Sequence, residues 1–299
     1  MTSRVEGIGI GFRYGFADAL LAADVPELRW LEIHPENYVG RGGRFRYRLD
    51  QARERYPLAT HGLTLGVGAV MPAEDDYVAP LAAFLADIGT PWHSEHLCFS
   101  GTGGVMLHDL LPLPFSPQSI ATAACRIGEL RDRIERPLAI ENVSYYAHPG
   151  GPPQMEEVDF LLQVLEAADA KLLLDVNNVW VNSQNHGFDA RAFLDRIPAE
   201  RVVQIHVAGP TVRPDGLIID THGEAVRSEC YELLEHVLER LGPVPVLLER
   251  DQNFPPFAEL VSEIRQLDAI YQRAIAVHAA RCARNVAEGP ARDVERALV

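Results

Sequence analysis

The sequence predicts an α/β protein of the (β/α)8 or TIM-barrel class, a single domain with a C-terminal helical extension. Short apolar strand patterns alternate with amphipathic helical patterns, as in the βαβ units of a parallel sheet. About eight such repeats fit into the chain, and eight repeats close a barrel. The chain has 299 residues, 47% of them hydrophobic, and one barrel of about 250 residues fits this length.

Eight segments have strand character, because each is short, apolar and bounded by turn residues. They are Gly7–Gly11, Arg29–His34, Leu58–Leu63, Trp92–Phe99, Pro137–Asn142, Lys171–Asn178, Val202–Gly209 and Val244–Asp251. The alternative is an open doubly wound sheet. It is disfavoured because no G-x-G-x-x-G motif follows the first strand, where "GIGIGFRYG" has a different spacing.

Helical periodicity separates the strands. The main helical patterns are Phe16–Ala23, Phe45–Arg55, Tyr77–Ile88, Pro117–Ile134, Met155–Ala168 and Glu224–Leu241. Ser116 followed by Pro117 is typical of an N-cap with proline at the first helical position. A further helical pattern runs from Phe257 to about Glu288. We therefore assign the barrel to residues 1–260 and a helical tail to residues 261–299.

Composition excludes several classes of protein. The net charge of −15 argues against a nucleic-acid binder, which needs a basic face. The four cysteines form no C-x-x-C pair, which argues against a disulfide scaffold or a structural zinc site. No apolar run reaches the roughly 18 residues of a membrane span, and the N-terminus lacks the apolar core of a signal peptide. We expect a cytoplasmic protein with reduced thiols.

Acids, amides and imidazoles stand at the ends of most of the predicted strands. They are Glu32, His34, Glu36, Asn37, His61, His93, Glu95, His96, Glu141, Asn142, Asp175, Asn177, Asn178, His206, Glu249 and Asp251, with Asp220 and His222 in the loop after the seventh strand. The carboxyl ends of barrel strands face one shared pocket. Buried carboxylates without cations cost several kcal/mol each. Imidazole with carboxylate, and no thiolate, suits iron, manganese or zinc, and the surplus of ligands favours two or more ions.

Several of these residues also have a purely structural interpretation. His34 and His93 suit hydrogen-bonded core histidines, and Asp175 suits a turn cap. Glu141 and Glu249 suit buried ion pairs. The amides Asn37, Asn142 and Asn178 suit turns or outer contacts better than ligation.

The motifs resemble those of the multinuclear non-heme iron-dependent oxidase family. The matching stretches occur in order from about Gly7 to Leu260: "HPENYVGRGG", "THGLTLGVG", "SEHLCFS", "DLLPLPF", "IENVSYY", "LLLDVNNVWVNSQNHGFDA", "QIHVAGP", "IDTHG" and "LLERD". The resemblance implies a barrel with two or three irons of mixed Fe(II)/Fe(III) valence and dioxygen as oxidant. It also implies oxidation of a residue, most often cysteine, in a ribosomally made precursor peptide, with a partner protein that presents the peptide.

The resemblance also implies roles for particular residues. The implied iron ligands are His61, His96, Glu141, Asp175, His206, His222 and Glu249, with Asn178 and Asp220 at a variable third position. Glu141 is implied to be the bridging carboxylate. Glu141, Asp175, His206 and Asp251 are the expected catalytic groups.

Substrate contacts are expected from Asn37, Tyr145, Tyr146 and Arg250. Arg250 and Pro210 stand where many relatives have Trp and His, so the pocket wall differs from theirs. The loops expected at the mouth are Val39–Arg46, Ser100–Pro117, Tyr145–Gln154 and Ala208–Ile218. The acidic charge favours a basic leader peptide or partner.

Two other functions fit the ligand set alone. One is a zinc or manganese barrel of the sugar-isomerase or phosphodiesterase kind. The other is a non-catalytic metal-binding scaffold of a biosynthetic complex. Metal identity separates the first from the oxidase, and oxygen consumption with the cognate peptide separates the second.

Overall fold

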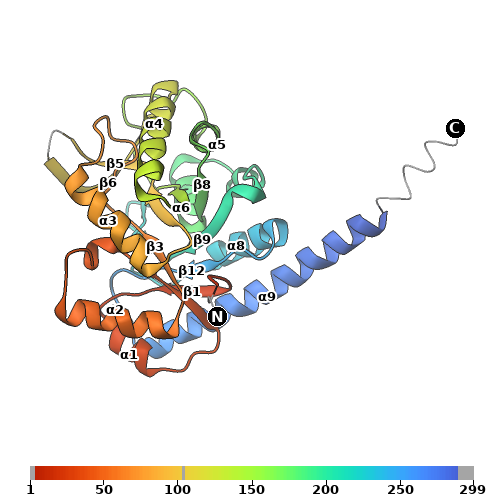
Figure 1. Ribbon diagram of the computed structural model, residues 1–299. Helices are drawn as coiled ribbons and strands as arrows, with labels where there is room; N and C mark the ends of the chain where they lie inside the picture. The colour runs from red at the N-terminus through yellow and green to blue at the C-terminus, as the bar shows by residue number, and fades with distance from the viewer. Residues whose placement is uncertain (1–3, 103–104, 289–299) are drawn as a thin grey trace.

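A closed barrel of eight parallel strands forms the centre of the computed structural model, which describes residues 4–102 and 105–288 (Figure 1). The barrel strands are β1 (Ile8–Gly11), β2 (Leu28–Ile33), β3 (Leu58–His61), β4 (His93–His96), β7 (Leu138–Glu141), β8 (Lys171–Asp175), β9 (Val202–Val207) and β12 (Val246–Leu248). Each pairs in parallel with the next, and β12 pairs with β1. The predicted TIM barrel is confirmed, with every barrel strand inside or within one residue of its predicted range.

Helices surround the barrel (Figure 1). They are α1 (Ala17–Ala22), α2 (Gly43–Arg55), α3 (Asp75–Ile88), α4 (Pro117–Ile134), α5 (Glu157–Ala168), α6 (Val176–His186), α7 (Ala190–Asp195), α8 (Ser228–Leu241) and α9 (Phe257–Glu288), with 3₁₀ turns η1 (Pro35–Asn37) and η2 (Ala199–Arg201). The Ser116 hydroxyl accepts a hydrogen bond from the Ser119 amide, which confirms the predicted N-cap of α4. Among residues 4–102 and 105–288, no helix is both long and apolar enough to cross a membrane.

Helix α9 belongs partly to the barrel. Leu260, Ile264, Leu267 and Tyr271 are buried in the core between the barrel and its helices. Beyond Ala274 the helix is mainly exposed, and Figure 1 shows it extending away from the barrel. The predicted C-terminal extension is confirmed, but the boundary proposed at residue 260 falls inside α9.

Three features depart from the sequence prediction. The predicted strand Lys171–Asn178 ends at Asp175, and Asn177 and Asn178 lie in the first turn of α6. The loop predicted at Ser100–Pro117 contains most of an antiparallel hairpin, formed by β5 (Cys98–Thr102) and β6 (Val105–Pro112). A second hairpin joins β10 (Thr211–Val212) to β11 (Ile218–Ile219).

The barrel interior has an apolar lower layer and a charged upper layer. Trp30, Ala59, Leu247 and Val5 form a buried cluster separate from the main core. Side chains two residues apart on a strand share a face, so the residues two positions further along these strands point into the same interior. Those residues are Glu32, His61 and Glu249. The Trp30 indole lies across this base and donates to the Gly7 carbonyl.

Candidate metal centre

Six predicted ligands lie buried at the carboxyl end of the barrel. They are His61, His96, Glu141, Asp175, His206 and Glu249, each at most 7% exposed. Each is the last residue of a barrel strand or lies within one residue of its end. The strands therefore bring these side chains together at the carboxyl end of the barrel.

The first group joins two imidazoles to one carboxylate. His61 Nε2 lies 3.1 Å and His96 Nε2 3.2 Å from Glu141 Oε2. The two Nε2 atoms are 3.2 Å apart. On the other side of its ring, His61 Nδ1 lies 2.9 Å from the Ser94 hydroxyl, which donates to the Thr60 carbonyl. Such an outer contact fixes the ring orientation that a ligating histidine needs.

The second group shares Glu141. His206 Nδ1 lies 3.2 Å from Glu141 Oε1 and 3.0 Å from Glu249 Oε2. Four ligand atoms lie within 4.8 Å of one another, one each from Glu141, Asp175, His206 and Glu249. The opposite nitrogen of His206 lies 3.0 Å from Glu32 Oε2 and 2.7 Å from Gln204 Nε2. Glu141 thus presents one oxygen to each group.

Unsatisfied buried atoms show that these residues suit a metal. The atoms Glu141 Oε2, Asp175 Oδ2, Asn178 Oδ1, His206 Nδ1, His222 Nε2 and Glu249 Oε2 are all buried and make no hydrogen bond. Leaving a buried polar atom unpaired costs about 1–3 kcal/mol, and more when it is charged. Several of these atoms lie near 3 Å from another ligand atom, yet they do not point at each other as donor and acceptor. Cations bound within these groups would satisfy such atoms.

The remaining predicted ligands, Asn178, Asp220 and His222, are less closely grouped. His222 Nε2 lies 2.7 Å from Asp220 Oδ1, which also accepts a hydrogen bond from the Asn177 amide. Asn178 donates its backbone N–H to Asp175 and keeps its side-chain oxygen free. Asp220 and His222 are 12% and 16% exposed, more than the other two groups. The structure therefore brings Asn178 close to Asp175 and leaves the Asp220–His222 pair nearer the mouth.

Opposite charges compensate each other within the cluster. Burial alone would lower the pKa of His206, but Glu32, Glu249 and Glu141 raise it well above its ordinary value. Burial and then Glu141 and Asp220 raise the pKa of Asp175. Burial alone would raise the pKa of Glu141, but His61, His96 and His206 hold it well below its ordinary value. Without a metal ion, protons on His206 and Asp175 offset the negative charge of the neighbouring carboxylates. Metal ions would displace these protons.

A further set, His34 with Glu249 and Asp251, also brings three potential ligands together. We do not regard it as a cation site, because Arg13 donates to Asp251 Oδ1 at 2.6 Å and to Glu249 Oε1 at 3.3 Å. His34 instead lies 2.9 Å from the His61 carbonyl through Nδ1. This is the hydrogen-bonded core histidine that the sequence allowed.

The predicted substrate contacts have different surroundings. Asn37 is exposed in η1. Tyr146 is 43% exposed, and its hydroxyl accepts from the Asp220 amide. Tyr145 is only 3% exposed and stacks on His186 at 4.1 Å, so the prediction that its ring offers a contact surface is wrong. Arg250 is also buried and pairs with Glu263 of α9 at 2.9 Å, so its guanidinium does not form the pocket wall as predicted.

Sequence reasoning missed Arg13 and Gln204 as parts of this region. Gln204 lies two residues before His206 on β9, so strand alternation alone places it beside the imidazole. Arg13 lies in the loop after β1, and its partners are far away in the sequence. Only the folded chain places it against Glu249 and Asp251.

The carboxyl of Glu157, at the start of α5, is buried beside Asn182. Asn182 donates to Glu157 Oε1, while Oε2 is covered and unpaired. Burial raises the pKa of Glu157 from 4.5 to about 7, and the Asn182 amide opposes part of this rise. The folded protein therefore holds this proton more tightly than the unfolded chain. The stability it contributes is complete below pH 4.5 and is lost as the pH rises to about 7.

Glu157→Gln should therefore be more stable than the wild type at pH 8, by about 1–3 kcal/mol at roughly 1.4 kcal/mol per pKa unit. The two proteins should match at pH 4. Urea unfolding at both pH values measures the difference. Glu156→Gln is the control, since Glu156 is exposed and pairs with Arg196. An equal effect of both substitutions at pH 8 would contradict the assignment.

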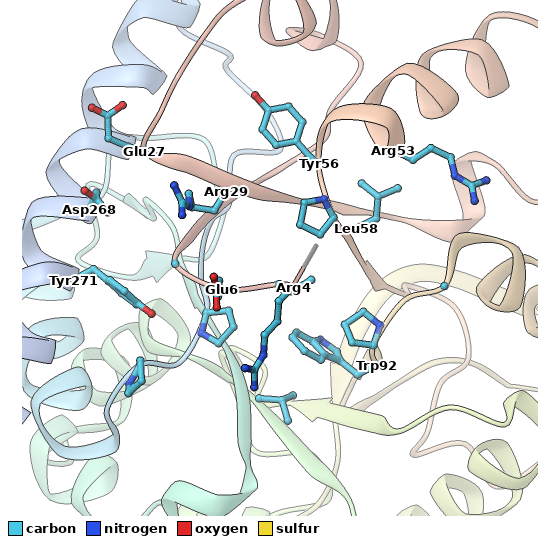
Figure 2. A pocket seen from close by; sticks show the side chains of 18 of the residues that line it. Arg4, Glu6, Glu27, Arg29, Arg53, Tyr56, Leu58, Trp92, Asp268 and Tyr271 are labelled. Carbon is cyan, nitrogen blue, oxygen red and sulfur yellow. The ribbon is translucent and has the colours of Figure 1, made fainter. Parts of the chain in front are cut away.

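A cavity lies at the amino-terminal end of the barrel strands, opposite the ligand cluster. It measures about 1390 Å³ and is lined by residues that precede or begin the strands, among them Gly7, Leu58 and Trp92, and by residues of α9 such as Asp268. Figure 2 shows cationic and anionic side chains mixed around it, including Arg4, Glu6 and Asp268. The Trp30 layer lies between this cavity and the ligand cluster. It is therefore not part of the candidate centre.

The fold and the cluster together define a TIM-barrel protein whose strand ends carry the nitrogen and oxygen donors of a metal site. Residues 7–272 match the family described as RiPP precursor modification enzyme MbnB/TglH/ChrH, where RiPP denotes a ribosomally synthesised and post-translationally modified peptide. The chain belongs to this family, as its motifs indicated. It is accordingly an enzyme that acts on ribosomal precursor peptides.

Related sequences cover nearly the whole chain. A UPF0276 protein of Shewanella amazonensis is 42% identical over 260 residues, which are 87% of this chain and 92% of the relative. A UPF0276 protein of Neisseria gonorrhoeae is 40% identical over 271 residues, covering 90% and 96%.

Solved structures resemble the fold. A xylose isomerase domain protein from Planctomyces limnophilus aligns with a TM-score of 0.58 at 13% identity, covering 90% of this chain and 98% of that one. Endonuclease IV from Thermus thermophilus aligns with a TM-score of 0.55 at 17% identity, covering 90% and 99%. These likenesses concern the barrel alone.

Proposed function

We propose that this enzyme is an iron- and dioxygen-dependent oxidase that modifies a cysteine of a ribosomal precursor peptide. The observation that carries the proposal is the pair of buried donor groups joined through Glu141, with one carboxylate oxygen facing each group. Membership of a peptide-modifying family supplies the substrate class. Nitrogen and oxygen donors without thiolate suit iron among the redox-active metals.

The residues divide among the proposed ions by their distances. His61, His96 and Glu141 would hold the first ion, and Glu141, Asp175, His206 and Glu249 the second. The resemblance implies a third ion held by Asn178 and Asp220, and His222, whose Nε2 lies 2.7 Å from Asp220 Oδ1, would join them nearer the mouth. Iron, when bound, would supply the redox chemistry with dioxygen that protein side chains lack.

The protein's own contribution is orientation and charge. Glu32 and Gln204 hold the outer nitrogen of His206, so that Nδ1 faces the centre. Asp251 is held between Arg13 and His222. Burial would raise the pKa of Asp251, but Arg13 holds it well below its ordinary value. Asp251 therefore stays ionised, and we propose that it positions His222 rather than accepting a proton from the substrate.

We further propose that a partner protein presents the peptide at the carboxyl end of the barrel. The exposed Tyr146 ring and the hairpin β5–β6 lie on loops that follow the strands carrying Glu141 and His96. The net charge of −15 favours a basic leader or partner. This association should weaken with added salt.

Metal analysis together with a peptide assay tests the proposal. The protein, purified with and without air, should contain more than one iron per chain. It should consume dioxygen only when given a Cys-bearing precursor peptide encoded beside its gene. Mass spectrometry should then show a changed cysteine, and a Cys→Ser peptide should stay unchanged. A colourless protein with one zinc per chain would instead support the hydrolase or isomerase alternative. Bound iron without peptide-dependent oxygen consumption would support the scaffold.

A further inference from the structure

We propose that a small pocket beside the metal centre, with Arg13 and Arg48 in its lining, binds a carboxylate group of the peptide substrate. This proposal rests on the proposed function, because it assumes that a peptide enters the carboxyl end of the barrel. It adds a requirement that the metal cluster does not impose, namely a negative charge near the modified residue.

The pocket has a buried cationic floor and an exposed aromatic rim. It measures about 80 Å³ and is lined by Phe12, Arg13, Tyr14, Ala17, Asn37, Tyr38, Phe45 and Arg48. Arg13 and Arg48 are 7% and 5% exposed, whereas Tyr14 and Phe45 are 55% and 37% exposed. Sites for drug-sized ligands measure roughly 300–1,000 Å³. This pocket therefore suits one functional group and not a whole cofactor.

Arg48 reaches the pocket from α2. Its guanidinium lies over the Tyr14 ring, 4.4 Å from the ring centre. One terminal nitrogen donates to Asp18, which also pairs with Arg44. The other terminal nitrogen, NH1, is buried and makes no hydrogen bond. A buried cationic donor without a partner is costly, and a ligand anion would satisfy it.

Arg13 links the pocket to the metal centre. It occupies two of its three nitrogens with Asp251 and Glu249, and its NH1 is likewise buried without a partner. Its guanidinium lies against Gly11, where an added Cβ would come within 2.7 Å of the guanidinium carbon. The absence of a side chain at Gly11 therefore leaves room for this guanidinium. Because Arg13 donates to Glu249, only the guanidinium would separate a group bound at Arg13 from this carboxylate.

The lining favours a carboxylate over other ligands. It contains two arginines and no acidic side chain. Guanidinium groups bind planar carboxylates through paired N–H donors. The Asn37 amide and the Tyr38 hydroxyl add neutral donors, and burial raises the pKa of Tyr38 to about 12, so the phenol keeps its proton. In a peptide, this group is either the C-terminal carboxylate or the side chain of Asp or Glu.

The test uses peptides that carry serine in place of cysteine, so that binding does not depend on a thiolate. One hexapeptide sequence is prepared with a free C-terminus, with an amidated C-terminus, and as amidated forms with Glu or Gln next to the serine. Isothermal titration measures their affinity for the full chain, both metal-loaded and metal-free. At least one carboxylate form should bind about ten- to a hundredfold more tightly than its neutral partner, the range expected for hydrogen bonds to a charged group.

The comparison of the two carboxylate forms identifies the source of the group. A gain with the free C-terminus alone assigns a terminal carboxylate, and a gain with Glu alone assigns a side chain.

Arg48→Gln should remove this gain, and Arg48→Lys should restore only part of it, because lysine lacks the paired donors. Arg44→Gln is the matched control. Arg44 lies on the same helix and shares Asp18, but it is exposed and does not line the pocket. It should leave the gain intact.

Equal binding of the charged and neutral peptides to the wild type would overturn the proposal, and this comparison needs no variant. Equal loss of the gain in the Arg44 and Arg48 variants would also overturn it, by assigning the effect to general charge. Failure of the proposed oxidase would appear separately, in metal content and oxygen consumption, while the peptide comparison would still stand.

Discussion

Glu141→Gln should empty two metal sites with one substitution and lower activity by more than about a hundredfold, the upper range for loss of an outer contact to a metal ligand. The substitution keeps the size of the side chain and removes the charge that His61, His96 and His206 face. Because the two oxygens serve different groups, both should lose affinity together. Metal analysis per chain and the peptide assay measure the two effects.

Glu95→Gln provides the control for this prediction. Glu95 is as buried as Glu141 and lies next to His96, but it faces His93 on the outer side of the barrel wall, with its Oε1 3.6 Å from His93 Nε2. It should retain its metal and its activity. If Glu141→Gln keeps full metal occupancy, or if both variants lose metal alike, Glu141 does not bridge the two sites.

Gly9→Ala should destabilise the fold by about 3 kcal/mol or more, at the upper end of the cost of overpacking a core. A Cβ at this position would lie 2.4 Å from the Trp30 ring, inside the closed barrel where neither β1 nor β2 can move aside. The indole is fully buried and closes the base of the barrel. Denaturant unfolding followed by circular dichroism measures the loss.

Gly128→Ala, in the middle of α4, should have the opposite sign. An added Cβ there meets no atom within 4 Å. Alanine is favoured over glycine in a helix interior by about 0.5–1 kcal/mol. A stabilised or unchanged Gly9→Ala protein would show that Trp30 can move, and that the base of the barrel is less tightly packed than the structure implies.

The sequence alone predicted most of the fold, because strand and helix periodicities differ strongly along this chain. It failed at α6, where the residues from Val176 to Ser183 are all buried, polar and apolar alike. A helix without an exposed face has no amphipathic pattern, so its start was read as more strand. The hairpin β5–β6 is not predicted, because the glycines of the sequence "SGTGGV" favour a loop over a strand.

The candidate ligands were predictable for a related reason. The six buried ligands lie at or within one residue of a strand end, and the barrel topology alone brings strand ends together. The substrate contacts were less predictable, because they depend on which loop covers which. Tyr145 is buried against His186 at the end of α6, the helix that periodicity could not reveal. Arg13 contacts Glu249 and Asp251, about 240 positions away in the sequence, and no local sequence pattern predicts such a contact.

The Trp30 layer also has a kinetic consequence. Since the indole and its neighbours fill the barrel below the ligands, the carboxyl end is the entrance that the peptide and the proposed dioxygen would share. A bound peptide then stands between the centre and the solvent. The order in which the two arrive should therefore affect turnover, and a peptide in excess should slow the reaction whenever it arrives first.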